Sequence, residues 1–162
     1  MPSVKSRPGQ ALVTTASGIA KGNTNGPWIS AAVAREASES MAESIDWDPV
    51  RELARRVEAG EALSLTAEVR ALLLRSAREV GIPEEDAHAA VAGVATATAL
   101  LHETRRRIRD GSQRLMRALT GARRLRDAGD AAGARALLED VLAVEQVPLY
   151  REQAELALED ME

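Results

Sequence analysis

The chain has 162 residues and a formal net charge of −4, and it contains no cysteine, which excludes disulfides, thiol catalysis and cysteine-based metal sites. Hydrophobic residues make up 45% of the sequence but aromatic residues only 2%, and there is no phenylalanine. A core of Leu, Val and Ala favours helices packed on helices over a β-sandwich, because strands favour β-branched and aromatic side chains, and the negative net charge argues against nucleic-acid binding through bulk charge.

The first 45 residues differ in composition from the rest. Residues 1–27 are rich in Gly, Ser, Thr and Asn, and such a segment buries too little apolar surface to offset its ordering entropy. We expect a disordered tail there; the alternative is a segment that folds onto a partner. Residues 28–45 have a weak helical pattern, which predicts a loosely attached helix. Its apolar positions are Ile29, Val33, Ala37 and Met41.

Residues 46–162 are predicted to form a single α-helical domain that begins with two short helices. Asp48 is expected to cap the first helix and Gly60 to end it. Thr66 is expected to cap the second and Gly81 to end it. Trp47 is expected to staple the start of the first helix or to fill the core, the alternative being an exposed contact residue.

A long central helix is predicted over about 84–128. From Ala87 onward, uncharged positions recur at alternating spacings of three and four residues, although the residues between them are rich in Arg. This heptad repeat is typical of a helix face packed against another helix, and its many small residues predict close packing. The positions are Ala87, Ala90, Val94, Ala97, Leu101, Thr104, Ile108, Gly111, Leu115, Ala118, Ala122 and Leu125.

Gly111 leaves two interpretations of this helix open. A glycine inside a helix costs about 1 kcal/mol relative to Ala. Its place in the heptad repeat, which continues to Leu115, favours an unbroken helix that another backbone or side chain approaches closely. The alternative is a break at residues 111–112, with Ser112 as a new N-cap.

A C-terminal helical hairpin is predicted after a tight turn at residues 126–130. One helix is expected over 131–144 and a last one over about 149–160, with a break at residues 146–148. Residues 129–148 also resemble one tetratricopeptide unit, although an ordinary helical hairpin is the alternative. That resemblance rests on Gly129, Asp130, Ala134, Leu137, Leu138, Val141, Leu142 and Pro148.

A larger resemblance covers about residues 47–160. It rests on residues 47–49 (WDP), 53–57 (LARRV), 65–73 (LTAEVRALL), 85–87 (EDA), 105–112 (RRRIRDGS), 125–130 (LRDAGD) and 147–151 (VPLYR). Together these motifs resemble the DUSAM domain, a bacterial paralogous family of uncharacterised function. The resemblance implies a small helical domain and assigns no catalytic residues.

The strongest local feature is a segment of nine arginines between residues 105 and 126, in which Asp110 is the one acidic residue. Guanidinium groups bind phosphates and carboxylates well. We expect many of these arginines to pair with the nine acidic residues of 130–162 as the hairpin folds back, each exposed pair contributing about 0–1 kcal/mol. The candidate interaction surface comprises Arg105, Arg106, Arg107, Arg109, Arg114, Arg117, Arg123 and Arg124.

The function expected from these features is a non-enzymatic protein-interaction or regulatory module, of which an inhibitor or immunity-type protein is one version. Its expected partner is another protein. The alternative is nucleic-acid binding through residues 105–126, although no aromatic residue lies there for base stacking. Homodimerisation through the heptad face is also open.

No catalytic residue, cofactor or metal site is predicted. His88 and His102 would lie roughly 21 Å apart along a straight helix, too far to share a metal ion. No serine is accompanied by a histidine at a spacing that suggests nucleophilic catalysis. No run approaches the roughly 20 apolar residues of a membrane span, and residues 14–18 are too polar for the core of an export signal. We therefore expect a cytoplasmic protein.

Overall fold

The computed structural model describes residues 45–161, which form six α-helices and no strand. The predicted all-α fold, with one long helix and a C-terminal pair of helices, is confirmed. The predictions for residues 1–44 lie outside the described residues. Within 45–161, no helix is both long and apolar enough to cross a membrane. The helices are α2 (Asp48–Glu58), α3 (Ala67–Glu79), α4 (Glu84–Ala90), α5 (Val94–Asp127), α6 (Ala131–Val144) and α7 (Pro148–Glu159).

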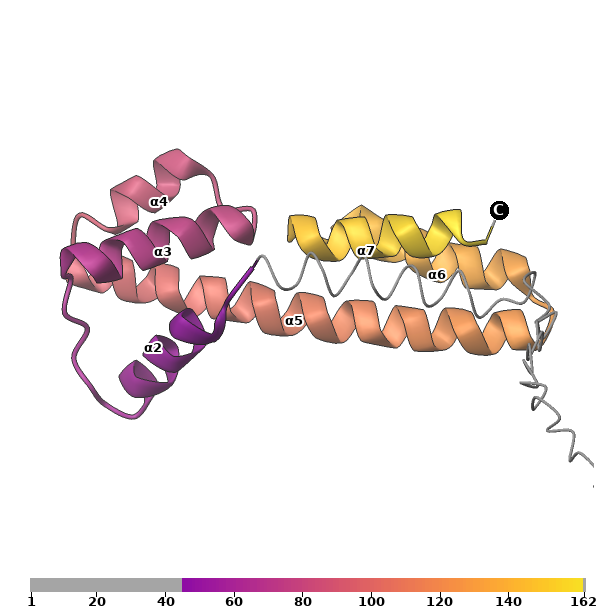
Figure 1. Cartoon of the computed structure of the whole chain (residues 1–162), viewed down its shortest axis with the longest axis horizontal. Helices are drawn as coiled ribbons and strands as arrows, with labels where there is room; N and C mark the ends of the chain where they lie inside the picture. Colours follow the sequence, from indigo (N-terminus) through magenta and orange to yellow (C-terminus); the bar gives the residue numbers. More distant parts are fainter. Residues whose placement is uncertain (1–44, 162) are drawn as a thin grey trace, which may run out of the picture.

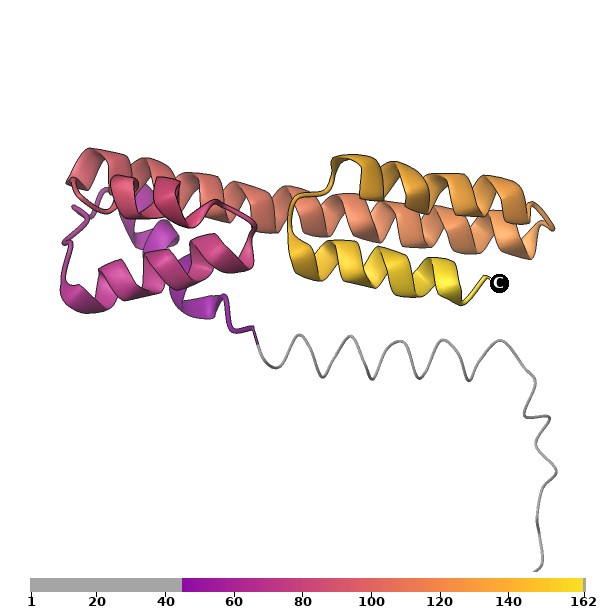
Figure 2. The same cartoon turned by 90° about the horizontal axis from the view of Figure 1, so that it is seen from above.

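The long helix α5 is the central element of the fold and contacts all the other described helices. It has 34 residues and therefore a length of about 51 Å. The helices α2, α3 and α4 surround its N-terminal half, while α6 and α7 lie along its C-terminal half (Figures 1 and 2). Each half thus has its own group of helices, and α5 is the element that both groups share.

The heptad face of α5 is buried along most of its length, as predicted. Eight of its predicted positions are buried within the helix, and Leu125 is partly buried. The helix is continuous at Gly111, so the predicted alternative of a break there is wrong. A Cβ atom on Gly111 would lie 2.5 Å from Cδ2 of Tyr150. The glycine is therefore needed for the close approach of α7. The buried positions are Ala97, Leu101, Thr104, Ile108, Gly111, Leu115, Ala118 and Ala122.

The predicted start of the central helix is wrong. The segment predicted as one helix over about 84–128 is two helices, because α4 ends at Ala90 and α5 begins at Val94. Gly93 is the N-cap of α5 with an extended backbone. The Thr96 hydroxyl donates to the Ala90 carbonyl oxygen at 2.6 Å, which closes the turn between the helices.

Trp47 fills the junction between the two halves. It is 6% exposed and is the N-cap of α2, whereas Asp48, predicted as the cap, is the first helical residue. Its indole Nε1 donates to Glu79 Oε2 at 3.0 Å. Its ring meets the Tyr150 ring edge to face, with centroids 5.7 Å apart. Trp47 therefore ties α2 to both α3 and α7, which confirms the prediction that it fills the core.

Candidate interaction surface

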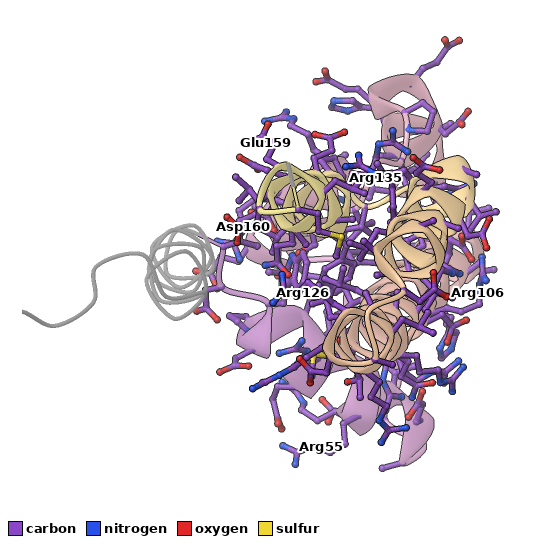
Figure 3. The ribbon with its side chains drawn as sticks, turned by 90° about the vertical axis from the view of Figure 1, so that its right-hand side faces the viewer. Arg55, Arg106, Arg126, Arg135, Glu159 and Asp160 are labelled. Atoms are coloured by element: carbon purple, nitrogen blue, oxygen red, sulfur yellow. The ribbon has the colours of Figure 1, made fainter. Side chains whose placement is uncertain are left out.

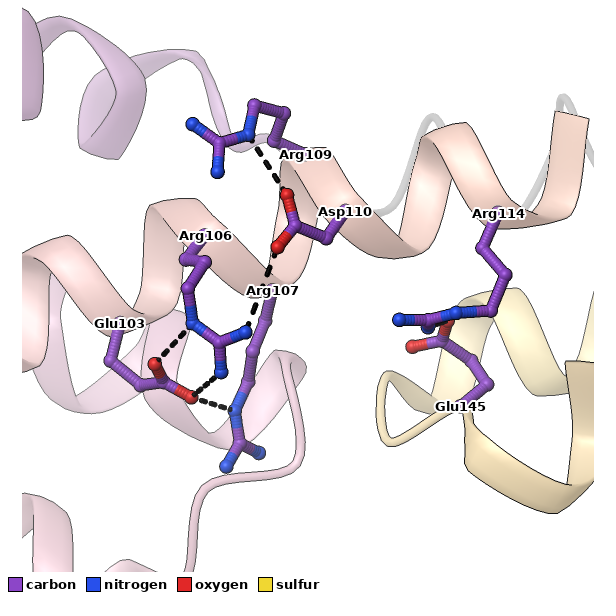
Figure 4. A network of polar contacts seen from close by, with 7 residues as sticks. All are labelled: Glu103, Arg106, Arg107, Arg109, Asp110, Arg114 and Glu145. Atoms are coloured by element: carbon purple, nitrogen blue, oxygen red, sulfur yellow. Dashed lines mark hydrogen bonds and ion pairs between the residues drawn. The ribbon is translucent and has the colours of Figure 1, made fainter.

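The first four arginines of the segment are held by carboxylates within the chain. We call Arg105, Arg106, Arg107 and Arg109 the proximal arginines. Figure 4 shows Glu103 between two of them: its carboxylate accepts from Nε of Arg106 at 2.8 Å and from Nε of Arg107 at 2.8 Å. The Arg106 hydrogen bonds, joined by those of Arg107, outweigh burial and lower the pKa of Glu103 to about 2.

The other contacts of the proximal arginines are also structural. Arg107 donates to the carbonyl oxygens of Val80 at 3.2 Å and Gly81 at 3.0 Å, which fixes the turn between α3 and α4. Arg105 pairs with a carboxylate of α2, and Arg109 pairs with its neighbour Asp110 at 2.9 Å. Arg105 and Arg107 therefore join α5 to the other helices of the N-terminal half, whereas Arg106 and Arg109 pair within α5.

The Glu103 cluster predicts a dependence of stability on pH. Because the pKa of Glu103 is lowered in the folded state, its contribution is complete above pH 4.5 and is lost as the pH falls towards 2. The side chain is 34% exposed, so solvent screening limits this contribution to about 0.5–1 kcal/mol. We expect Glu103→Gln to lose less stability than the wild type between pH 5 and pH 2.

Urea denaturation at both pH values measures this difference. The control is Glu139→Gln, because Glu139 is exposed on α6. The prediction fails if Glu103→Gln and Glu139→Gln show the same loss on acidification.

Arg114 makes a different contact, with a buried carboxylate that the sequence analysis did not single out. Its partner Glu145 follows α6 directly, and the Glu145 side chain is 2% exposed. The other carboxylate oxygen of Glu145, Oε1, accepts from the backbone amides of Gln146 at 3.0 Å and Val147 at 2.9 Å. Arg114 therefore anchors the connection between α6 and α7 onto the middle of α5 (Figure 4).

The predicted pairing between the arginine segment and the acidic C-terminal helices is wrong apart from that contact. Within residues 45–161, Arg114–Glu145 is the one ion pair that joins α5 to the chain after residue 130. The side of α6 that is buried carries Ala134, Leu138 and Val141. Its acidic residues lie on other sides of the helix, and on α7 Glu159 points away from α5 (Figure 3).

The four remaining arginines are uncompensated and are spread over the exposed sides of α5 at its far end. Arg117, Arg123, Arg124 and Arg126 are exposed, and no ion pair or hydrogen bond to their side chains occurs among the described residues. Met116 lies beside them and is 59% exposed. No acidic residue occurs between residues 111 and 126. We call these four arginines and Met116 the distal arginine surface.

A hollow between α2 and α5 includes two candidate residues, Arg105 and Arg109. Its volume is about 880 Å³. Its other charged residues include Arg51, which pairs with Asp48 at 3.3 Å. No histidine lines it. Over residues 45–161, no three potential metal ligands come together. The arrangement offers charge and hydrogen bonds for binding.

Comparison with known protein families identifies the family of this chain. A family model described as a protein of unknown function, DUF2379, matches residues 45–161. The chain belongs to the DUF2379 family. The match covers every described residue, so both halves of the fold are part of the DUF2379 domain. No curated protein matches the chain, and no solved structure does.

Proposed function

We propose that this DUF2379 chain is a non-enzymatic interaction module that binds an acidic protein partner through the distal arginine surface. The supporting observation is the set of four exposed arginines without partners among residues 45–161, beside the exposed Met116. Arg and Met are enriched in protein interfaces, and desolvated Arg often dominates the binding energy. The buried heptad face holds the backbone of these residues in a continuous helix, so binding requires no ordering of the backbone.

Nucleic-acid binding through residues 105–126 is the second candidate, and charge distribution makes it less favourable. The proximal arginines are already paired with carboxylates. The adjoining helices carry exposed acidic residues, among them Glu139, Asp140, Glu155 and Glu159. Packed helices lie 8–10 Å apart, about one Debye length in physiological salt. A phosphate backbone would therefore meet both signs of charge, whereas a small acidic protein patch can contact the arginines alone.

The family resemblance supports a narrower assignment. We propose that this DUF2379 domain is also the DUSAM domain that the motifs resemble, with a regulatory rather than catalytic role. Several of those motifs lie at the junction of the two halves. The WDP motif begins with the buried Trp47, and the VPLYR motif carries the buried Tyr150.

The test of the interaction proposal is a pair of charge reversals on the distal arginine surface. We expect Arg117→Glu/Arg124→Glu to weaken partner binding at least about tenfold, since truncating one interface hot spot costs about 2 kcal/mol or more. Arg55→Glu/Arg70→Glu, which changes the same charge at exposed positions of α2 and α3, should bind like the wild type. Affinity purification from the native host with mass spectrometry identifies the partner, and titration with the purified partner measures the affinity.

Two outcomes would reject the proposal. One is a partner that binds both double variants equally. The other is a steeply salt-dependent affinity for duplex DNA or RNA that only Arg117→Glu/Arg124→Glu loses, which would instead assign the surface to nucleic acid.

A further inference from the structure

One side of the C-terminal half has no helix over it among the described residues. The helix α6 lies on one side of the α5–α7 pair, and Arg126 of α5 and Asp160 after α7 both lie on the other side (Figure 3). Residues spaced by three and four along each helix share that side. We call it the α5–α7 face. It comprises Ser112, Met116, Leu119, Arg123 and Arg126 of α5, with Leu149, Gln153, Leu156 and Asp160 of the α7 segment.

The α5–α7 face leaves apolar side chains partly exposed and arginines without ion-pair partners among the described residues. Leu119 and Leu156 are only half-buried, although each lies in the middle of its row. Arg123 and Arg126 have no ion-pair partner within residues 45–161. The face therefore offers a central apolar contact with cationic groups beside it, which suits an amphipathic helix with acidic flanks.

The chain itself reaches this face at its first described residue. Ile45 is packed against the core, and with Leu149, Tyr150 and Gln153 it lines a hollow at the start of α7. Arg75 donates to the Asp46 carbonyl oxygen at 3.1 Å, which fixes the backbone at this point. Ile45 is therefore held at one end of the α5–α7 face.

The preceding sequence matches the face in pattern and in length. Ile29, Val33, Ala37 and Met41 recur every four residues, and Ile45 is the next member of the same row. A row spaced by four is a ridge that packs into the groove of another helix. As a helix, residues 28–44 would extend about 25 Å, close to the roughly 24 Å of α5 between Ser112 and its C-terminal end.

The charges also match. Residues 28–44 contain three acidic residues and one Arg, a net charge of −2. Glu36 and Glu43 lie on the same flank of the apolar row, since seven residues are two helical turns. With residue 44 beside Ser112, Glu36 would lie level with residue 120, within reach of Arg123, which lacks an ion-pair partner in residues 45–161.

We propose that residues 28–44 dock as a helix on the α5–α7 face, antiparallel to α7, and complete a four-helix bundle with α5, α6 and α7. The tether at Ile45 sets the direction, because the chain must arrive at the start of α7 from its far end. Docking covers Leu119 and Leu156 together with Met116, Arg123 and Arg126 of the distal arginine surface, and leaves Arg117 and Arg124 on the outer side of α5. The test of the proposed function changes only Arg117 and Arg124, so the two proposals can fail separately.

Hydrogen exchange of the full chain tests the docking. The amides of residues 33–44 should exchange at least about tenfold more slowly than those of an unfolded peptide. Val33→Asp, which places a charge in the apolar row, should abolish this protection. Ala31→Asp is the matched control, because position 31 lies on the opposite side of the same helix and should retain the protection.

Three outcomes would overturn the proposal. Exchange of residues 33–44 at the unfolded rate in the wild type would exclude docking. Equal loss of protection in both variants would show that the apolar row is not the contact. Protection that falls on dilution, together with a dimer in light scattering, would assign the face to a second copy of the chain.

Discussion

Replacing Glu145 by Ala is expected to lower the free energy of unfolding by about 2–4 kcal/mol, since removing one partner of a buried polar network leaves the others unsatisfied. Its carboxylate accepts from two backbone amides, those of Gln146 and Val147, and pairs with Arg114. The amide of Val147 lies in a fully buried residue and has no other hydrogen-bond acceptor among the described residues. The loss should therefore loosen α7 from α5.

Urea denaturation measures the effect, with two comparison variants. Glu139→Ala removes an exposed carboxylate from α6 and should change stability by no more than about 0.5 kcal/mol. Glu145→Gln keeps one carbonyl oxygen for the amides and loses the charge, so its stability should lie between those of the other two variants. Equal stability of Glu145→Ala and Glu139→Ala would contradict the role assigned to Glu145.

The elements that sequence reasoning located best are those set by local signals. The Thr66 hydroxyl accepts from the Val69 amide at 3.2 Å, as expected of an N-cap. Gly81 has a positive φ of 75°, a conformation that suits glycine after a helix. The heptad face of α5 is buried because its spacing matches the helical period. Each of these features depends on residues within a few positions of one another.

The turn between α4 and α5 was missed because the heptad spacing continues across it. Ala87 in α4 and Ala97 in α5 are both buried, but Val94, the predicted position at the start of α5, is 52% exposed. Gly93 was the signal that could have placed the break, together with Thr96, whose hydroxyl reaches back to Ala90. A spacing pattern records which residues face a core, and it does not record whether the backbone between them is continuous.

The ion-pair partners of the arginines were predicted wrongly because the sequence shows how many charged residues each segment has, but not which side of the folded helix they face. Glu103 lies three and four residues before Arg106 and Arg107, on the same side of the helix, and such local pairs need no tertiary arrangement. The C-terminal acidic residues face outwards because the apolar residues of α6 and α7 occupy the sides against α5. Glu145 could not be distinguished from its acidic neighbours, although its position just before a helix with Pro at its start favours an acceptor for free amides.

Replacing Gly111 by Ala is expected to destabilise the fold by about 1–3 kcal/mol, the range for overpacking a close contact. In an exposed helix the same change would stabilise by about 1 kcal/mol. Here the added Cβ would lie 2.5 Å from Cδ2 of Tyr150 and 3.0 Å from Oε1 of Glu145. The Tyr150 ring cannot move away freely, because its hydroxyl donates to the Ile108 carbonyl oxygen at 3.0 Å and its ring packs on Trp47.

Gly121→Ala in the same helix separates this contact from helix propensity. Its Cβ would meet only Cδ1 of Leu137, at 2.8 Å, and the end of a half-buried leucine side chain can rotate away. We therefore expect Gly121→Ala to lie between no effect and a gain of about 1 kcal/mol, measured by urea denaturation beside Gly111→Ala. Opposite signs would establish that Gly111 is retained for the approach of Tyr150, whereas a shared gain would mean that α7 can shift along α5 without loss.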